Sequence, residues 1–409
     1  MFLKKSILRS SDSPSGEHSL SSAGGGSFHR LAFIGGAILA IVLQQALVKA
    51  SETEQRTCWL YVATYSAQDG EGIFLAGFDR RTGAIVDVRP TGGLLSPAAI
   101  VLHPGGKFLY ATTLLMDIRE QAVGGVVALA VNEATGELQE IDRRPSGGTG
   151  PCYLSVDSEG ECLLVAHCGT ATVACLGLQP DGRFGMSSTV IPQLGESRNA
   201  EGKPQAHSIL VAPGNRFAIA ADLGLDRLFV YRLEAQAARL TPHDPPFAPV
   251  AQGAGPRHLA AHPNGRFVYS VNELDNTVTA CKFSGETGRL KRLPDVSTLP
   301  ADFRGESYAA EIQVHPTGRY LYVSNRGHDS LAMFSIDTES GQLESIGYVS
   351  SQGNFPRHFA MDPAGRFLIV ANQKSDQLSV FQIDPASGQL KSQGTPVMLP
   401  QPVCVKFAM

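Results

Sequence analysis

Histidine, arginine and carboxylate side chains recur at the ends of short apolar segments along this chain. They are His207, Asp222, Arg257, His258, Glu273, Glu311, Arg326, His328, Arg357 and His358. Arginines bind anions through a fork of N–H donors, and a histidine or a glutamate can take a proton from water. Taken singly, each residue is more often a solvated charge or a structural histidine. Gathered at one place, they would form an anion-binding pocket that contains a base.

An internal repeat supplies the elements that would position these residues. The phrase His262-Pro263-Asn264-Gly265-Arg266-Phe267 has related copies that begin at His103, Pro213, His315 and Asp362, and degraded copies reach Cys162 and Trp59. Their spacing of roughly 50 residues is typical of propeller blades rather than helical solenoids. In the clearest copy we expect strands at 258–262, 267–271 and 278–283 and a fourth strand from 290 onward, because these runs are rich in β-branched and aromatic residues.

The two ends of the repeat array indicate how many blades it has. The chain enters at Trp59 in the register of a second strand, and residues 402–407 align with the first strand at 356–361. The last strand would therefore complete the first blade and remove the open sheet edges. We predict an all-β fold over residues 51–409. It is a seven-bladed β-propeller of four-stranded antiparallel blades, closed by N- and C-terminal strands that share one blade.

This architecture brings the polar residues together. In a propeller, the first strand of each blade lines the central channel and the second strand returns to the same rim. First-strand starts contribute His207, Arg257, His258, Glu311, Arg357 and His358, and second-strand ends contribute His167, Asp222, Glu273, Arg326 and His328. We therefore predict one functional site at this rim. The opposite face receives His103, His262 and His315, which we interpret as turn residues.

Composition narrows the classes of function. Lys+Arg number 34 against 38 Asp+Glu, the net charge is -4, and no basic run follows the first residues, so binding of nucleic acid is not expected. The rim residues lack the spacing of a zinc site, and the chain has no Gly-x-Ser-x-Gly elbow or phosphate-binding loop. We expect no metal and no cofactor.

Residues 1–50 differ in kind from the repeat array. Lys4, Lys5 and Arg9 precede a Ser- and Gly-rich stretch, and an apolar run follows at 31–43. This run is short for a membrane span and suits a secretory signal or a short anchor, which would be cleaved or disordered. The seven cysteines include no Cys-x-x-Cys pair and cannot all pair with one another, so they fit small buried residues better than a disulfide framework.

Several phrases resemble those of a known family. Pro256-Arg257-His258-Leu259, the Ser-Asn-Arg-Gly-His-Asp-Ser segment at 324–330 and the segment 222–227 are similar to signature phrases of the seven-bladed propeller lactonases. That family includes the propeller type of 6-phosphogluconolactonase and the fungal carboxy-muconate lactonizing enzymes. By motif, the catalytic residues of the muconate enzymes would fall on His207, Arg257, Glu273 and Arg326.

The resemblance implies a carboxylic ester hydrolase that acts on a small lactone, most simply 6-phospho-D-glucono-1,5-lactone. A water deprotonated by Glu273 or His207 would attack the carbonyl, arginines would stabilise the oxyanion, and Arg357 would bind the phosphate. His258, Glu311, His328, His358 and Asp222 would help to bind substrate. A 3-carboxy-cis,cis-muconate cycloisomerase and a non-catalytic binding propeller remain alternatives. We expect a monomer, exported if the leader acts as a signal and otherwise cytoplasmic, as is usual in the family; export would favour an unphosphorylated aldonolactone.

Overall fold

The computed structural model describes residues 57–65, 71–116, 122–197 and 202–408. The chain divides into one unit at 1–55 and a second at 56–409, and the strands belong to the second unit. The predicted leader at 1–50 lies outside the described residues. Within the described residues, no helix is long and apolar enough to cross a membrane.

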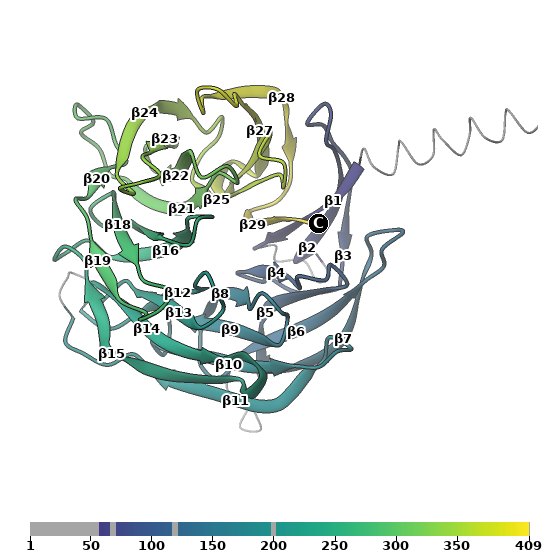
Figure 1. Ribbon diagram of the computed structural model, residues 1–409. Coiled ribbons are helices and arrows are strands. Elements are labelled where there is room, and N and C mark those ends of the chain that lie inside the picture. Colours follow the sequence, from purple (N-terminus) through teal and green to yellow (C-terminus); the bar gives the residue numbers. More distant parts are fainter. Residues whose placement is uncertain (1–56, 66–70, 117–121, 198–201, 409) are drawn as a thin grey trace, which may run out of the picture. The chain divides into compact units, whose positions relative to one another are not determined.

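Seven antiparallel sheets surround a central channel (Figure 1). The innermost strands contact one another in a closed ring around this channel. They are β4 (Ile100–Leu102), β8 (Pro151–Val156), β12 (Ala206–Val211), β16 (Pro256–Ala261), β21 (Tyr308–Val314), β25 (Pro356–Met361) and β29 (Pro402–Phe407). The predicted seven-bladed β-propeller is confirmed.

The second and third strands form the middle of each blade. The second strands are β1 (Thr57–Thr64), β5 (Phe108–Met116), β9 (Cys162–His167), β13 (Phe217–Asp222), β17 (Phe267–Asn272), β22 (Tyr320–Arg326) and β26 (Phe367–Asn372). The third strands are β2 (Ile73–Asp79), β6 (Ala122–Val131), β10 (Thr172–Leu178), β14 (Arg227–Glu234), β18 (Thr277–Phe283), β23 (Ser330–Ile336) and β27 (Gln377–Ile383). Their alternating side chains are buried on both faces, as sheets between two neighbours require.

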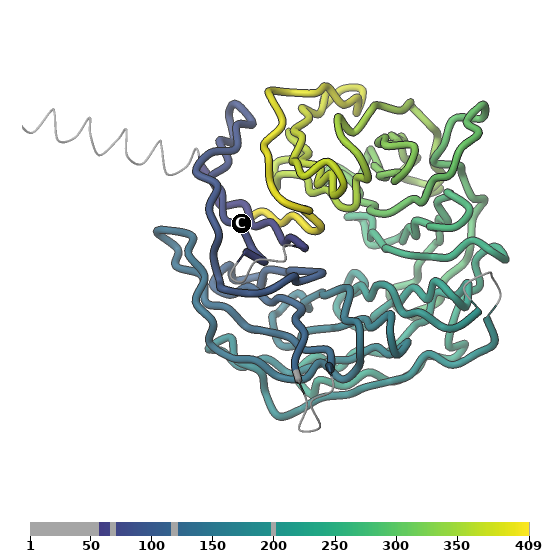
Figure 2. The backbone as a smooth tube through the Cα atoms, turned by 180° about the vertical axis from the view of Figure 1, so that it is seen from behind, coloured from purple at the N-terminus to yellow at the C-terminus, as the bar shows by residue number. Residues whose placement is uncertain are grey.

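The fourth strands form the outer wall, which Figure 2 shows from behind. They are β3 (Ile85–Thr91), β7 (Leu138–Pro145), β11 (Phe184–Pro192), β15 (Arg239–Pro249), the pair β19 (Leu290–Arg292) and β20 (Val296–Ser297), β24 (Leu343–Ser350) and β28 (Leu390–Met398). The described residues contain two short 3-10 turns, η1 (Ala235–Ala237) and η2 (Gln373–Ser375).

The two termini of the propeller share one blade, as predicted. β29 pairs antiparallel with β1, with Leu60 opposite Phe407 and Val62 opposite Val405. β1 thus occupies the second position in a blade whose innermost strand comes from the C-terminus. This pairing leaves no open sheet edge between the first and last blades.

The hydrophobic core is distributed between blades rather than concentrated at one centre. Seven clusters of buried side chains lie in the seven contacts between adjacent blades. Between the fifth and sixth blades, for example, Tyr269 and Val271 of β17 pack with Leu321 and Val323 of β22. Each blade is therefore held by its two neighbours, and the ring is stable as a whole.

Histidines that follow the inner strands of three blades bond each of these blades to the next one. His262 Nε2 donates to the carbonyl oxygen of Gly318 at 2.8 Å, and His315 Nε2 donates to that of Gly365 at 2.8 Å. His103 makes the equivalent bond to Gly160 at 3.2 Å. These histidines, expected to be turn residues, link neighbouring blades on the face away from the predicted site.

Candidate functional site

A β-bulge in the inner strand of several blades positions the site. In β16 the register shifts between Pro256 and His258, so Arg257 has no partner across the ladder. The equivalent shifts fall at three further residues, namely Cys152, His207 and Arg357. A bulge adds one residue and re-aims its side chain. Arg257 and His258, although consecutive, therefore both line the channel pocket.

Glu273 lies between two buried arginines. Its Oε2 is 2.8 Å from Nε of Arg257 and 2.9 Å from Nη2 of Arg326. The arginine side chains are 2% and 7% exposed, whereas Glu273 is 18% exposed. Arg257 Nη1 also donates to the carbonyl of Ala310 at 2.9 Å. Burial lowers the pKa of Arg257 to about 10, and this is consistent with a crowded positive site.

His207 lies beside this group. Its ring packs at 5.4 Å from the ring of His258. Within the described part of the chain, Nδ1 of His207 is buried and has no hydrogen-bond partner. The pKa of His207 is held well below its usual value, mainly by burial. The positive charges of Arg257, Arg357 and Arg326 lower it further. The imidazole is therefore neutral at neutral pH.

A second buried group lies beneath Arg257. Glu311 Oε2 is 2.6 Å from Nδ1 of His258 and 3.5 Å from Nε2 of His358. Burial raises the pKa of Glu311 to about 7 and holds the pKa of both histidines well below normal. Because burial disfavours charge on both side chains, His258 is neutral and Glu311 is about half protonated at neutral pH, and the protonated carboxyl donates to Nδ1 of His258.

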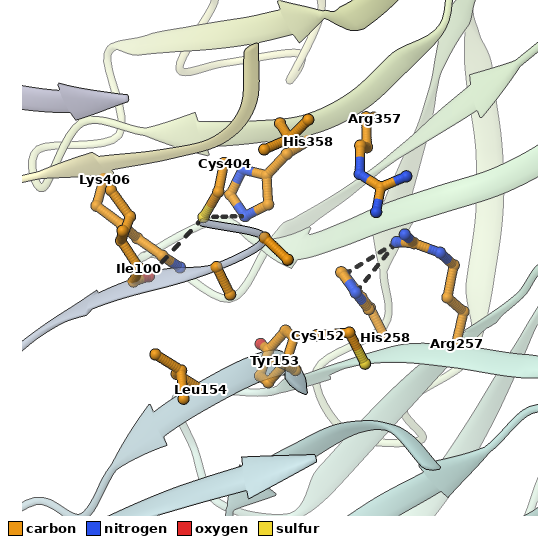
Figure 3. Close-up of a pocket in the computed structure, with 13 residues that line it drawn as sticks. Ile100, Cys152, Tyr153, Leu154, Arg257, His258, Arg357, His358, Cys404 and Lys406 are labelled. Atoms are coloured by element: carbon orange, nitrogen blue, oxygen red, sulfur yellow. Dashed lines mark hydrogen bonds between the residues drawn. The ribbon is translucent and has the colours of Figure 1, made fainter. Parts of the chain in front are cut away.

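Arg357 faces Arg257 across the pocket (Figure 3). Its Nη2 donates to the hydroxyl of Tyr65 at 3.1 Å, and its guanidinium lies over the Tyr65 ring at 5.3 Å. The empty space in the pocket and at its open mouth amounts to about 360 Å³, and Lys406 also lines it. Cations outnumber ionised carboxylates here, so the pocket favours an anionic ligand.

Asp222, His328 and His167, which were also predicted at this rim, make their contacts away from the arginine cluster. Asp222 is buried, and its Oδ1 accepts hydrogen bonds from the backbone amides of Gln205 and Leu225, both at 2.9 Å, so it holds its own loop. His328 bonds through Nδ1 to Ser330 at 2.6 Å, and its ring packs edge-on against Phe303 at 4.6 Å. The contacts that the structure gives these two residues do not include the arginine cluster. The rim histidine His167 is likewise buried inside its blade, against Ser146 at 2.9 Å.

Sequence reasoning missed several residues of the pocket. Tyr153 packs edge-on against His258 at 4.9 Å, and Cys404 lies 3.7 Å from Nε2 of His358. Cys152, Lys406 and Cys404 line the same cavity. The sequence could have indicated Cys152 as a pocket residue, because it follows Pro151 in its repeat as Arg257 follows Pro256 in its own. Cys404 and Lys406 enter only through the closing strand β29.

The described residues contain no group of three or more His, Cys, Asp or Glu side chains that could hold a metal. The arrangement offers instead a neutral imidazole, two arginines fixed by a carboxylate, and a third arginine facing them. Such a site can deprotonate a bound water and stabilise negative charge on a carbonyl oxygen.

The chain is similar to known propeller lactonases in sequence and in structure. A family model described as "Lactonase, 7-bladed beta-propeller" matches residues 59–407. The 6-phosphogluconolactonase of Bacillus subtilis is 32% identical over 349 residues, which cover 85% of this chain and 97% of that protein. The periplasmic gluconolactonase PpgL of Pseudomonas aeruginosa is 33% identical, with a TM-score of 0.77, over 86% of this chain and 99% of that structure.

Proposed function

Because the chain belongs to the seven-bladed β-propeller lactonase family, we propose that it hydrolyses a sugar δ-lactone at the site formed by His207, Arg257, Glu273 and Arg326. The substrate that we propose first is 6-phospho-D-glucono-1,5-lactone. The observation that carries the proposal is the pair of buried arginines held by one carboxylate beside a neutral histidine. The family resemblance inferred from the motifs is confirmed, and with it the class of lactone hydrolases.

His207 is the base in this proposal. Its imidazole is neutral and its Nδ1 has no hydrogen-bond partner in the described residues, so it can take a proton from the attacking water without breaking an ion pair. Glu273 is less suited, because protonation would remove its ion pairs to Arg257 and Arg326. We assign Glu273 instead to holding the two guanidinium groups in place.

The arginines stabilise the negative charge that develops on the lactone carbonyl oxygen. Attack of hydroxide on the carbonyl carbon gives a tetrahedral oxyanion, which Arg257 and Arg326 bind in the water-poor channel. The protonated His207 then returns its proton to the ring oxygen as the ester bond breaks. The product is an open-chain carboxylate, and no metal or cofactor takes part in any of these steps.

Arg357 and Lys406 support a phosphorylated substrate. Both line the pocket with Arg257, and the structure gives Arg357 a neutral partner, Tyr65, rather than a carboxylate. A guanidinium in this state can bind two oxygens of a phosphate group. We therefore assign the 6-phosphate to Arg357.

An unphosphorylated aldonolactone is the second candidate. It is favoured by the similarity to a protein described as a periplasmic gluconolactonase and by the signal-like residues 1–50, which would place the enzyme outside the cytoplasm. In that case Arg357 would contact sugar hydroxyl groups. In either case we propose that the enzyme acts as a monomer on a small molecule, since β29 closes the ring within one chain.

The test is a pH-stat assay of the full chain with 6-phosphogluconolactone and with glucono-δ-lactone, corrected for spontaneous hydrolysis. We expect turnover that persists in the presence of a chelator, with the higher kcat/KM for the phosphorylated lactone. Arg357→Met should reduce that preference and leave hydrolysis of glucono-δ-lactone less affected. Absence of turnover with both lactones, together with cycloisomerisation of 3-carboxy-cis,cis-muconate followed by ultraviolet absorbance, would contradict the proposal and favour the cyclase.

A further inference from the structure

Two cysteines occupy site positions in the third blade. Cys152 is the bulge residue of β8, as Arg257 is the bulge residue of β16. Cys168 follows the last residue of β9, as Glu273 follows the last residue of β17. The backbone confirms this equivalence, because Cys168 N donates to Gly150 O at 3.0 Å and Glu273 N donates to Gly255 O at 2.8 Å.

Side chains at these two positions meet across the blade. In the fifth blade they form the ion pair of Arg257 with Glu273 at 2.8 Å. In the third blade they are two thiols at the same end of the β8–β9 strand pair: Cys152 Sγ lies 3.6 Å from the carbonyl oxygen of Ala166, and Cys168 Sγ lies 3.3 Å from that of Gly150. Both cysteines are partly exposed, whereas the other five cysteines of the propeller are buried. Cys152 also lines the channel pocket with Arg257 (Figure 3).

We propose that Cys152 and Cys168 form a redox-active thiol pair, which is oxidised to an intramolecular disulfide by exchange with a low-molecular-weight disulfide. Both cysteines are free in this structure. Pro151 pairs with His167 in the β8–β9 ladder, and each cysteine follows one member of that pair, so the two thiols lie at the same end of one strand pair, from which a disulfide can form.

Cys168 is the thiol that reacts first. Its interaction with the Cys152 thiol, and the charges of Arg357 and Arg257, lower the pKa of Cys168, and a thiolate is the reactive form. The thiolate attacks one sulfur of the small disulfide, whose S–S bond breaks, and a mixed disulfide forms on Cys168. Cys152 then loses its proton to solvent and attacks the Cys168 sulfur. The second small thiolate leaves, so the chain loses two electrons and the small disulfide gains them.

The oxidised pair would alter the site described above. The Cys152 thiol lies 3.5 Å from the carbonyl oxygen of His207, and Cys168 Sγ lies 3.3 Å from that of Gly150. Drawing the two sulfurs together changes both contacts, and the first involves the proposed base. This consequence for turnover rests on the proposed function, whereas formation of the disulfide does not.

The test uses the reduced full chain, equilibrated in glutathione buffers of increasing oxidised fraction, quenched with iodoacetamide and mapped by mass spectrometry. We expect loss of free thiols at Cys152 and Cys168 together, a linked peptide that contains both, and full reversal by dithiothreitol. The buried pair Cys162 and Cys175 is the internal control and should remain unlinked.

Two variants make the result specific. Cys152→Ser should abolish the linked peptide and trap glutathione on Cys168, while Cys168→Ser should abolish both products. The proposal is overturned if both thiols stay alkylatable in the most oxidising buffer, or if each binds glutathione separately without a linked peptide. Because mapping does not measure turnover, its outcome is independent of whether the chain hydrolyses lactones. If it does, the linked form should turn over more slowly, and reduction should restore the rate.

Discussion

Replacement of Glu273 by glutamine should destabilise the propeller far more than loss of an ordinary surface charge. Its carboxylate is 2.8 Å from Arg257 and 2.9 Å from Arg326, and both guanidinium groups are buried. The isosteric amide keeps the volume but leaves two neighbouring positive charges uncompensated, with Arg357 adding a third. The site thus loses its central negative charge.

The magnitude follows from burial. Removing one partner of a fully buried ion pair costs about 3–5 kcal/mol. Since Glu273 is 18% exposed, water screens part of this interaction, and we expect a loss of about 2–4 kcal/mol in the free energy of unfolding. The matched control is Glu339→Gln, whose partner Arg266 lies at 3.1 Å with side-chain exposures of 85% and 51%. That change should cost less than about 1 kcal/mol.

Urea unfolding of the two variants and the wild type at neutral pH measures this difference through the transition midpoints and slopes. High phosphate should recover part of the loss in Glu273→Gln, because an anion bound between the arginines stabilises the folded state. Equal midpoints for Glu273→Gln and Glu339→Gln would refute the reasoning, since the two arginines would then not depend on Glu273 for their stability.

Two further predictions concern pH and backbone geometry. Burial raises the pKa of Glu311 from 4.5 to about 7, so this residue contributes stability that is present below pH 4.5 and is lost as pH rises to 7. Relative to Glu311→Gln, the wild type should lose on the order of 3 kcal/mol across that range in urea midpoints, and a constant difference would contradict the assignment. Gly341 has φ +80°, and a Cβ there would lie 2.2 Å from the Phe267 ring, whereas Gly394 has φ +71° and open space around it. Gly341→Ala should therefore lower the thermal midpoint clearly more than Gly394→Ala, because only the former adds overpacking to backbone strain. Similar midpoints would show that the Phe267 ring moves aside freely.

Much of the fold could be predicted because its information is local and repeated. The turn phrase ending in Phe267 recurs along the chain and marks the blades. The segment at Trp59 begins as a second strand and residues 402–407 match a first strand, which predicts that the two ends share one blade and that there are seven blades. The gathering of Arg257, Glu273 and Arg326 followed from that architecture. These residues lie at equivalent strand ends in neighbouring blades, and the ion pairs of Glu273 with Arg257 and Arg326 confirm that they meet.

The detailed membership of the site was harder to predict, because it depends on single-residue shifts. A bulge changes which side chain faces the channel, and a shift of one residue reverses the direction of a side chain. Asp222 is the last residue of β13 and turns back to its own loop, whereas Glu273, one position later in its blade, faces the arginines. Lys406, which lines the pocket, and Tyr65, which contacts Arg357, come from opposite ends of the propeller sequence, so only the closed ring brings them together here.

The most direct test of the central claim is the lactonase rate of Arg257→Ala, measured by pH-stat beside Arg257→Lys, with near-ultraviolet circular dichroism to verify folding. If Arg257 stabilises the oxyanion, the alanine variant should lose about 10²–10³-fold in kcat. The lysine variant, which keeps the charge but not the planar fork, should fall between the alanine variant and the wild type. A folded alanine variant with wild-type turnover would contradict the account and place the chemistry elsewhere on the propeller.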